Sequence, residues 1–262
     1  MAGVAICYRL RQMGMEVLTV SRSELDARNP NLSGLNLLGA SAIVNALGLI
    51  NRRLDLPESD FLLVNSLFPR RLADYCDRFG IRLIHISTDC VFSGDQGPYD
   101  EAAPATADDR YGQSKYWGEP PNAMVIRTSI IGPEINNHYS LLSWVLKQKG
   151  RVPGFANHQW NGVTSDELSR AIGDILIQDL WVKGVRHVFG EDLTKFELLS
   201  LIRKTYNMEC EILSSNAPQT RDTRLRTIYP EFLRALRILP MPEQLLRMRA
   251  LSDHLGNWCI AS

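Results

Sequence analysis

The chain has 262 residues, a length that fits one large domain or a main domain with a smaller one. Apolar residues make up 45% and charged residues 22%, which excludes the disordered and collagen-like classes. Lys plus Arg and Asp plus Glu both total 29, and this balance argues against a general nucleic-acid binder. Because no apolar run reaches the roughly 18 residues that span a bilayer and no signal peptide is recognised, we expect a cytoplasmic protein with no membrane partner.

Four short apolar runs in the first half of the chain predict buried β-strands. They cover Glu16–Ser21, Ser41–Gly48, Ile81–Ser87 and Ala123–Thr128. Before the third run, Asp60–Gly80 has apolar residues at helical spacing and ends on a glycine. Strands that alternate with helices favour an α/β fold with a doubly wound, Rossmann-like parallel sheet, in which ligands bind at the carboxyl ends of the strands.

Helical patterns dominate the second half. They predict helices over Tyr139–Lys149, Ser165–Gln178, Lys195–Tyr206 and Pro242–Leu255, with short extended pieces at Val185–Phe189 and Glu209–Leu213. Two helices open with a capping-box pattern, Thr164 with Glu167 and Thr194 with Glu197. We therefore expect residues 1–131 to form the doubly wound domain. Residues 132–262 are expected to form a smaller, mainly helical domain, some segments of which return to the sheet.

The segment Tyr111-Gly-Gln-Ser-Lys115 carries the clearest chemical signal. Residues four apart lie on one helix face, so the ammonium is expected near the phenol. A nearby cation favours phenolate and lowers a pKa that is normally about 10, which would make the tyrosine an acid/base group. The pair alone is equally typical of a solvated helix face. Its context adds weight, because Ile81–Ser87 leads into Thr88 and Asp89 at the predicted ligand edge of the sheet.

Three segments, taken in order, resemble the extended short-chain dehydrogenase/reductases. They are ISTDCVFSGDQGPYDE from Ile86, YGQSKYWGE from Tyr111 and VIRTSIIGPE from Val125. The chain is most similar to the dTDP-4-dehydrorhamnose reductase branch, whose members reduce nucleotide-linked keto-sugars. The resemblance implies that Tyr111 protonates the C4 carbonyl, that Lys115 tunes it, and that Thr88 binds the same oxygen. Asp89 is implied as a supporting carboxylate, although it equally fits a cap of the loop.

The resemblance also implies a nicotinamide cofactor and a nucleotide-sugar substrate. Arg22, beside Ser21, favours NADPH, with NAD as the alternative and a surface arginine as the plainer interpretation. The implied cofactor contacts are Gly3, Ser21, Arg22, Asn45, Ala46, Leu47, Gly48, Asn65, Ser87, Tyr111, Lys115, Thr128 and Ile130. The implied substrate contacts are Thr88, Val91, Phe92, Trp160, Asn161 and Thr164. No metal is expected, and the family is compatible with a homodimer.

The amino end departs from the family pattern of a strand followed by Gly-x-x-Gly-x-x-Gly. Gly3 aligns with the last glycine and Val4–Met13 with the first helix, so the first strand and two glycines have no counterpart. We expect Glu16–Ser21 to lack its inner neighbour. The pattern is compatible with a sequence that starts late, with a partner that fills the gap, and with lost cofactor binding.

Three functions therefore stay open at this point. The first is an NADPH-dependent reductase, which consumes its cofactor. The second is an epimerase or dehydratase of the same superfamily, which shows no net consumption of NADPH. The third is a non-catalytic protein that binds a sugar nucleotide or regulates a partner, like the regulatory subunit of methionine adenosyltransferase.

Overall fold

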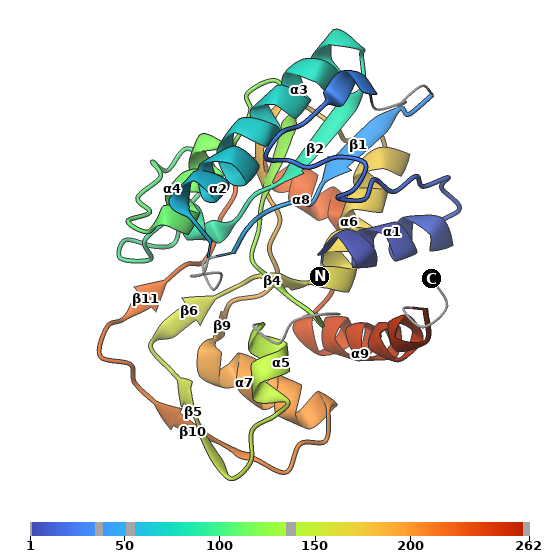
Figure 1. The fold of residues 1–262 in the computed structure, drawn as a ribbon. Helices are drawn as coiled ribbons and strands as arrows, with labels where there is room; N and C mark the ends of the chain where they lie inside the picture. Colours follow the sequence, from blue (N-terminus) through green and yellow to red (C-terminus); the bar gives the residue numbers. More distant parts are fainter. Residues whose placement is uncertain (1, 35–38, 51–55, 135–139, 259–262) are drawn as a thin grey trace.

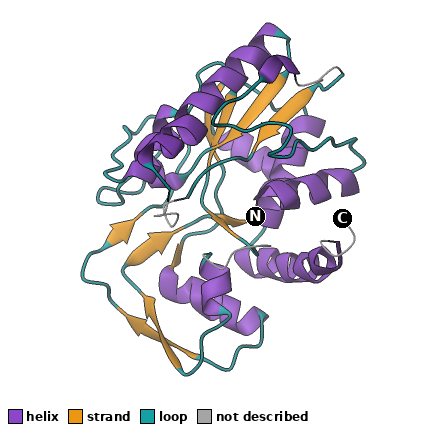
Figure 2. Ribbon diagram, in the orientation of Figure 1, coloured by secondary structure: helices purple, strands orange, loops and turns teal. Residues whose placement is uncertain are grey.

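The structure, a computed structural model, describes residues 2–34, 39–50, 56–134 and 140–258 (Figure 1). Its larger part, at the top of Figure 1, is a sheet with helices on both faces. The smaller part lies below and contains helices together with short strands (Figure 2). Among the residues described, no helix combines the length and the apolar character needed to cross a bilayer.

Four parallel strands form the main sheet in the order β1-β2-β3-β8. They are β1 (Ala42–Asn45), β2 (Arg82–Ile86), β3 (Met124–Arg127) and β8 (Gly184–His187). Side chains of β2 and β3 are almost all buried, as expected for strands covered by helices on both sides. The strands predicted at Ser41–Gly48, Ile81–Ser87 and Ala123–Thr128 are confirmed. The extended piece at Val185–Phe189 supplies most of β8 and belongs to this sheet.

Helices cover each face of the sheet and build two apolar cores. On one face lie α1 (Ala2–Gln12), α6 (Ser165–Ile177) and α8 (Pro230–Leu236), which pack on Ile84, Met124 and Ile126. The other face carries one continuous helix made of α2 (Glu58–Phe61), a π-helical turn η2 (Leu62–Leu67) and α3 (Phe68–Arg78). This helix confirms the prediction for Asp60–Gly80. The short helix α4 (Arg110–Trp117) packs against η2.

The smaller part has its own core, built around Trp160, Leu198 and Leu245. Its helices are α5 (Leu141–Val145), α7 (Lys195–Thr205) and α9 (Met241–Trp258). Its strands are β5 (Arg151–Phe155), β6 (His158–Trp160), β9 (Leu193–Thr194), β10 (Glu211–Ser215) and β11 (Arg221–Asp222). A two-stranded connection, β4 (Ile130–Ile131) with β7 (Val163–Thr164), joins it to the segment after β3. Two 3-10 turns, η1 (Leu32–Gly34) and η3 (Asp89–Val91), complete the described elements.

One predicted strand is wrong. Glu16–Ser21 forms no strand in the structure, and it contains Leu18, whose side chain is 70% exposed. A strand requires a neighbour for its backbone hydrogen bonds, and no described strand pairs with this segment. The apolar pattern alone therefore does not hold these residues in a sheet.

Two local predictions need correction as well. The helix predicted over Tyr139–Lys149 is only the five-residue α5, capped by the Ser140 hydroxyl; Tyr139 lies outside the described residues. Thr194 and Glu197 form the full reciprocal capping box. Thr164 caps α6 by accepting from the Glu167 amide, but the Glu167 carboxylate binds Arg170, so only half of the second box exists.

Candidate active site

The chemistry-bearing residues meet where β2 ends and α4 begins. Thr88 follows β2 and caps the η3 turn, its hydroxyl accepting from the Cys90 amide at 3.1 Å. Asp109 caps α4 by accepting from the Gly112 amide at 2.8 Å. A side chain at position 112 would overlap the carbonyl of Cys90, so this glycine permits the close approach of α4 to η3.

This approach brings Thr88 and Tyr111 together. The Thr88 hydroxyl lies close enough to the Tyr111 phenol to lower the pKa of the phenol, and it donates to the Asp89 carboxylate at 3.2 Å. Thr88 itself is 6% exposed. The Thr88 hydroxyl and the Tyr111 phenol thus lie close together although they come from different elements. Two groups that bind the same oxygen atom must be close to each other.

The predicted direction of the Tyr111 pKa is wrong. Desolvation raises the pKa of the phenol, and the carboxylates of Asp89 and Asp109 raise it further, while the hydrogen bond with Thr88 lowers it. The ammonium of Lys115 donates instead to the carbonyl of Ile86 at 2.7 Å. The Tyr111 phenol therefore holds its proton more tightly than a free tyrosine does.

Lys115 is a buried cation beneath the site, with only 3% of its surface exposed. Burial lowers the pKa of its amine to about 8, and the Glu119 carboxylate opposes this shift. The amine lies beside the end of β1, because a Cβ placed on Gly48 would be 3.8 Å from Nζ and 3.6 Å from Oδ1 of Asn65. Gly48 thus lies next to the Lys115 amine, at a distance where a Cβ would make ordinary contact.

Asp89 is buried at the turn that follows Thr88. Burial raises the pKa of its carboxyl, whereas hydrogen bonds with Ser129 and Thr88 and the charge of Lys195 lower it. Its amide donates to the Thr128 carbonyl at 3.1 Å, which ties the end of β2 to the end of β3. Asp89 thus both lies next to the phenol and holds the loop, in line with the two roles considered for it.

The predicted cofactor residues at the β1 end form one group. Gly3, in the first turn of α1, would place a Cβ 3.9 Å from that of Ala46, and Leu47 and Gly48 are exposed beside it. Asn45 is buried, and its amide donates to Nδ1 of His85 at 3.0 Å.

Several other predicted contacts have their side chains engaged within the protein. Asn65 is fully buried, accepting from the Leu49 amide at 2.8 Å and donating to the Leu49 carbonyl at 3.0 Å. The Ser87 hydroxyl donates to Glu119 at 2.6 Å. Thr128 is 2% exposed. Such residues shape the floor of the site and present no free polar side chain to a ligand.

The remaining cofactor residues are more accessible. Ser21 and Arg22 lie on an exposed loop, where the Ser21 hydroxyl donates to Glu24 at 2.6 Å and Arg22 approaches Asp26 at 3.9 Å. Ile130 is half-buried in β4.

The predicted substrate contacts other than Thr88 are also buried in the structure. Val91 and Phe92 belong to a separate core, in which Phe92 stacks on Tyr99 with ring centroids 4.2 Å apart. Trp160 packs in the core of the smaller part. The two polar residues, Asn161 and Thr164, are 1% and 0% exposed, and their side chains bind Leu225 and the start of α6. Contact of these five side chains with a sugar stays a prediction.

The sequence analysis missed a buried ion pair below the site. Arg127 and Glu119 form a two-bonded contact, with Nε to Oε1 at 2.9 Å and Nη2 to Oε2 at 2.7 Å. The signal was available, because Arg127 ends a fully apolar strand. A charge in such a position requires a partner of opposite charge.

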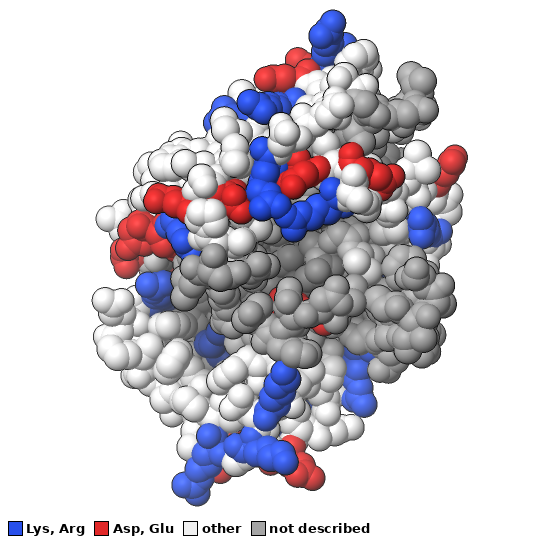
Figure 3. Space-filling model, viewed as in Figure 1, with Lys and Arg blue, Asp and Glu red and all other residues white. Residues whose placement is uncertain are grey.

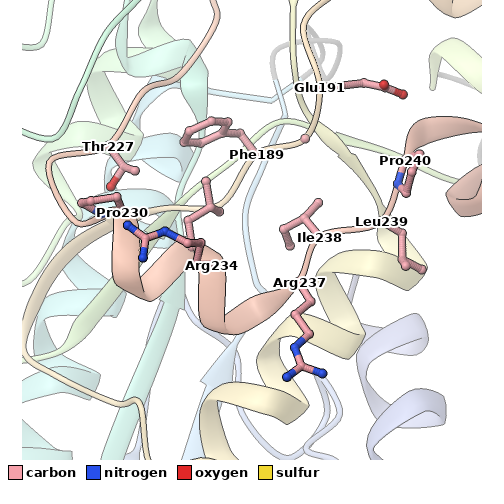
Figure 4. A pocket seen from close by; sticks show the side chains of 11 residues that line it. Phe189, Glu191, Thr227, Pro230, Arg234, Arg237, Ile238, Leu239 and Pro240 are labelled. Carbon is pink, nitrogen blue, oxygen red and sulfur yellow. The ribbon is translucent and has the colours of Figure 1, made fainter.

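A hollow on the surface of the described part of the chain lies away from these residues. Its volume is about 550 Å³, and it is lined by α8 and the segments 189–191 and 237–240. Figure 4 shows Phe189 and Ile238 among its walls, with Arg237 directed away from them. No predicted site residue lines it. On the face shown in Figure 3, Lys and Arg are interspersed with Asp and Glu, and no basic stripe marks a nucleic-acid site.

Solved structures support the fold over nearly the whole chain. A dTDP-4-dehydrorhamnose reductase from Clostridium acetobutylicum matches with a TM-score of 0.80 and 17% identity, covering 96% of both chains. The Bacillus anthracis protein of that name, determined in complex with NADP, matches with a TM-score of 0.76 and 22% identity, covering 95% of both chains. These likenesses establish the Rossmann-like α/β fold.

Curated relatives share sequence over shorter stretches. The Mycobacterium tuberculosis dTDP-4-dehydrorhamnose reductase is 33% identical over 133 residues, 44% of this chain and 42% of that protein. The Aggregatibacter actinomycetemcomitans protein of that name is 30% identical over 191 residues, 67% of this chain and 65% of that protein. The zebrafish (Danio rerio) methionine adenosyltransferase 2 subunit beta is 30% identical over 49% of this chain and 42% of its own. The first of these matches thus spans less than half of its relative's length.

The family profile described as RmlD substrate binding domain matches residues 1–227, which is most of the chain. This chain belongs to that family.

Proposed function

We propose that the protein is an NADPH-dependent reductase of a nucleotide-linked 4-keto-6-deoxysugar, with Tyr111 as the proton donor. The observation that carries this proposal is the close packing of α4 on the η3 turn, which places the Tyr111 phenol beside the Thr88 hydroxyl. Two hydroxyl groups that already meet are placed to bind one carbonyl oxygen between them. The names of the relatives from M. tuberculosis and A. actinomycetemcomitans support the class of substrate.

The raised pKa of Tyr111 suits the reduction of a carbonyl group. Reduction turns a carbonyl oxygen into an alkoxide, which must receive a proton. A phenol that stays protonated in its desolvated environment holds that proton at the hydroxyl until negative charge develops next to it. Thr88 stabilises the same oxygen by hydrogen bonding, in the manner of an oxyanion site.

The residues at the end of β1 fit a nicotinamide dinucleotide. Gly3 and Ala46 approach each other with no bulky side chain between them, and Gly48 lies next to the Lys115 amine. Gly3 and residues 46–48 would hold the dinucleotide at the start of α1, where backbone amides favour phosphate. Lys115 would bind the nicotinamide ribose, and Arg22 would favour the 2′-phosphate of NADPH over NADH. When bound, the cofactor supplies the hydride.

The test follows NADPH absorbance with a dTDP-4-keto-6-deoxyhexose. Tyr111→Phe should lower kcat by at least about 100-fold, because a general acid typically contributes 10²–10⁴-fold. Tyr116→Phe is the matched control, since Tyr116 lies on the same helix but is 43% exposed. It should keep the wild-type rate. Equal rates for wild type and Tyr111→Phe would refute the role of the phenol.

The same assay separates the other functions. Sugar interconversion without net loss of NADPH would identify an epimerase or dehydratase. Binding of the sugar nucleotide in calorimetry, with no turnover of either kind, would identify a non-catalytic binding protein.

A further inference from the structure

Glu119 connects three elements of the site through one carboxylate. Its Oε1 accepts from the Ser87 hydroxyl at 2.6 Å and from Nε of Arg127 at 2.9 Å, and its Oε2 accepts from Nη2 of Arg127 at 2.7 Å. The side chains of Glu119 and Arg127 are 7% and 5% exposed. All of these contacts are made within the protein, so Glu119 offers nothing to a substrate or cofactor.

Both partners of Glu119 are sequence neighbours of residues that form the proposed site. Ser87 immediately precedes Thr88. Arg127 precedes Thr128, whose carbonyl accepts from the Asp89 amide at 3.1 Å. Glu119 lies two residues after the end of α4, the helix that carries Tyr111.

The end of α4 has little freedom to move. A Cβ on Gly118 would overlap the carbonyl of Asn65, so the helix end lies directly on the η2 backbone. The Ser66 hydroxyl donates to the carbonyl of Ser114 at 2.7 Å, which adds a second attachment. With η2 on one side and the Glu119 contacts on the other, α4 is held in one position relative to β2 and β3.

We propose that Glu119 is a positioning residue, which sets the distance between Thr88 and Tyr111 by joining the end of α4 to the ends of β2 and β3. This inference rests on the proposed reductase function. Removing two charges from water costs free energy, so a buried ion pair is a poor device for stability alone. A bidentate contact does fix geometry, because the guanidinium and carboxylate planes must align.

Glu119 has a second effect, on Lys115. Its negative charge raises the pKa of the Lys115 amine against the opposing effect of burial. The other charged groups around this pair are Arg127 on β3 and the imidazoles of His85 on β2 and His187 on β8, and burial lowers the pKa of both imidazoles. Of these groups, Glu119 is the one whose charge raises the pKa of the Lys115 amine.

The first experiment uses Ser87→Ala, which removes one hydrogen bond but keeps the ion pair and therefore the fold. We expect kcat to fall about tenfold, because a misplacement of about 1 Å costs up to about 100-fold in rate, while KM for NADPH stays within about twofold. Ser87→Thr, which keeps a hydroxyl, should restore most of kcat. A rise in KM for NADPH at constant kcat would overturn the inference, because Ser87 would then be a cofactor contact.

The second experiment measures Lys115 directly. Lysine labelled with ¹³C at Cε gives one NMR signal for each lysine, and Lys115→Arg identifies the signal of interest. In Glu119→Gln the titration midpoint of Lys115 should fall by about one pH unit, since loss of a nearby opposite charge lowers an amine pKa. Glu231→Gln, which breaks the exposed pair with Arg234, is the control and should leave the midpoint unchanged.

The two experiments separate failure of this inference from failure of the proposed function. A wild-type protein that never oxidises NADPH refutes the reductase but leaves the NMR titration interpretable. A wild-type kcat in Ser87→Ala overturns the positioning role of Glu119 even when the reductase is active, and an unchanged Lys115 midpoint in Glu119→Gln overturns its effect on Lys115.

Discussion

Burial of Lys115 makes a prediction about how stability depends on pH. The pKa of its amine falls from 10.5 to about 8 in the folded protein, mainly because of desolvation. Between these two pH values the unfolded chain binds one more proton at this site than the folded protein does. The unfolding free energy therefore rises with pH across this window, and this gain is lost again as the pH falls through 8.

The size of the effect follows from the two pKa values. Each pKa unit corresponds to about 1.36 kcal/mol, so the full change across the window is about 3 kcal/mol. Lys115→Met removes the titrating group and fills similar space. The variant should be more stable than wild type near pH 7, where the buried charge costs most, and this advantage should shrink by about 3 kcal/mol as the pH rises towards 10.5.

Urea denaturation of both proteins between pH 7 and pH 10 provides the measurement. The difference in unfolding free energy between them removes the contributions of all other groups. Lys183→Met is the control, because Lys183 is half-exposed and pairs with Asp77 on the surface, and it should produce no change of this size. A pH-independent difference between wild type and Lys115→Met would refute the argument from burial.

Two further predictions concern packing and burial. Gly118→Ala should lower the unfolding free energy by at least about 1–3 kcal/mol, because the new methyl would overlap the Asn65 carbonyl. Thermal unfolding measures this loss. The control is Gly3→Ala, which should leave Tm close to wild type because its Cβ would make only ordinary contact at 3.9 Å. Asn161→Ala should cost roughly 2–5 kcal/mol, because two backbone groups of Leu225 lose their partners. Its KM for the nucleotide sugar should stay within about twofold; a tenfold rise at unchanged stability would restore Asn161 as a substrate contact.

The sequence alone determined the local features of the fold. Apolar runs predicted three strands of the main sheet, because strands covered on both faces must be apolar throughout. Helical spacing predicted the long helix of residues 58–78, and the hydroxyl of Thr194 with the carboxylate of Glu197 predicted the capping box of α7. The Tyr111 and Lys115 spacing, together with Thr88, identified the candidate site.

The tertiary structure decided what depends on neighbours distant in the chain. Glu16–Ser21 has a strand-like sequence but no described partner strand, and hydrogen bonding between strands is not encoded in one segment. Burial of Trp160 and Asn161 likewise follows from packing against other segments. The pKa of Tyr111 is set by desolvation and by the surrounding carboxylates as well as by helical spacing, so its direction follows only once the elements are assembled.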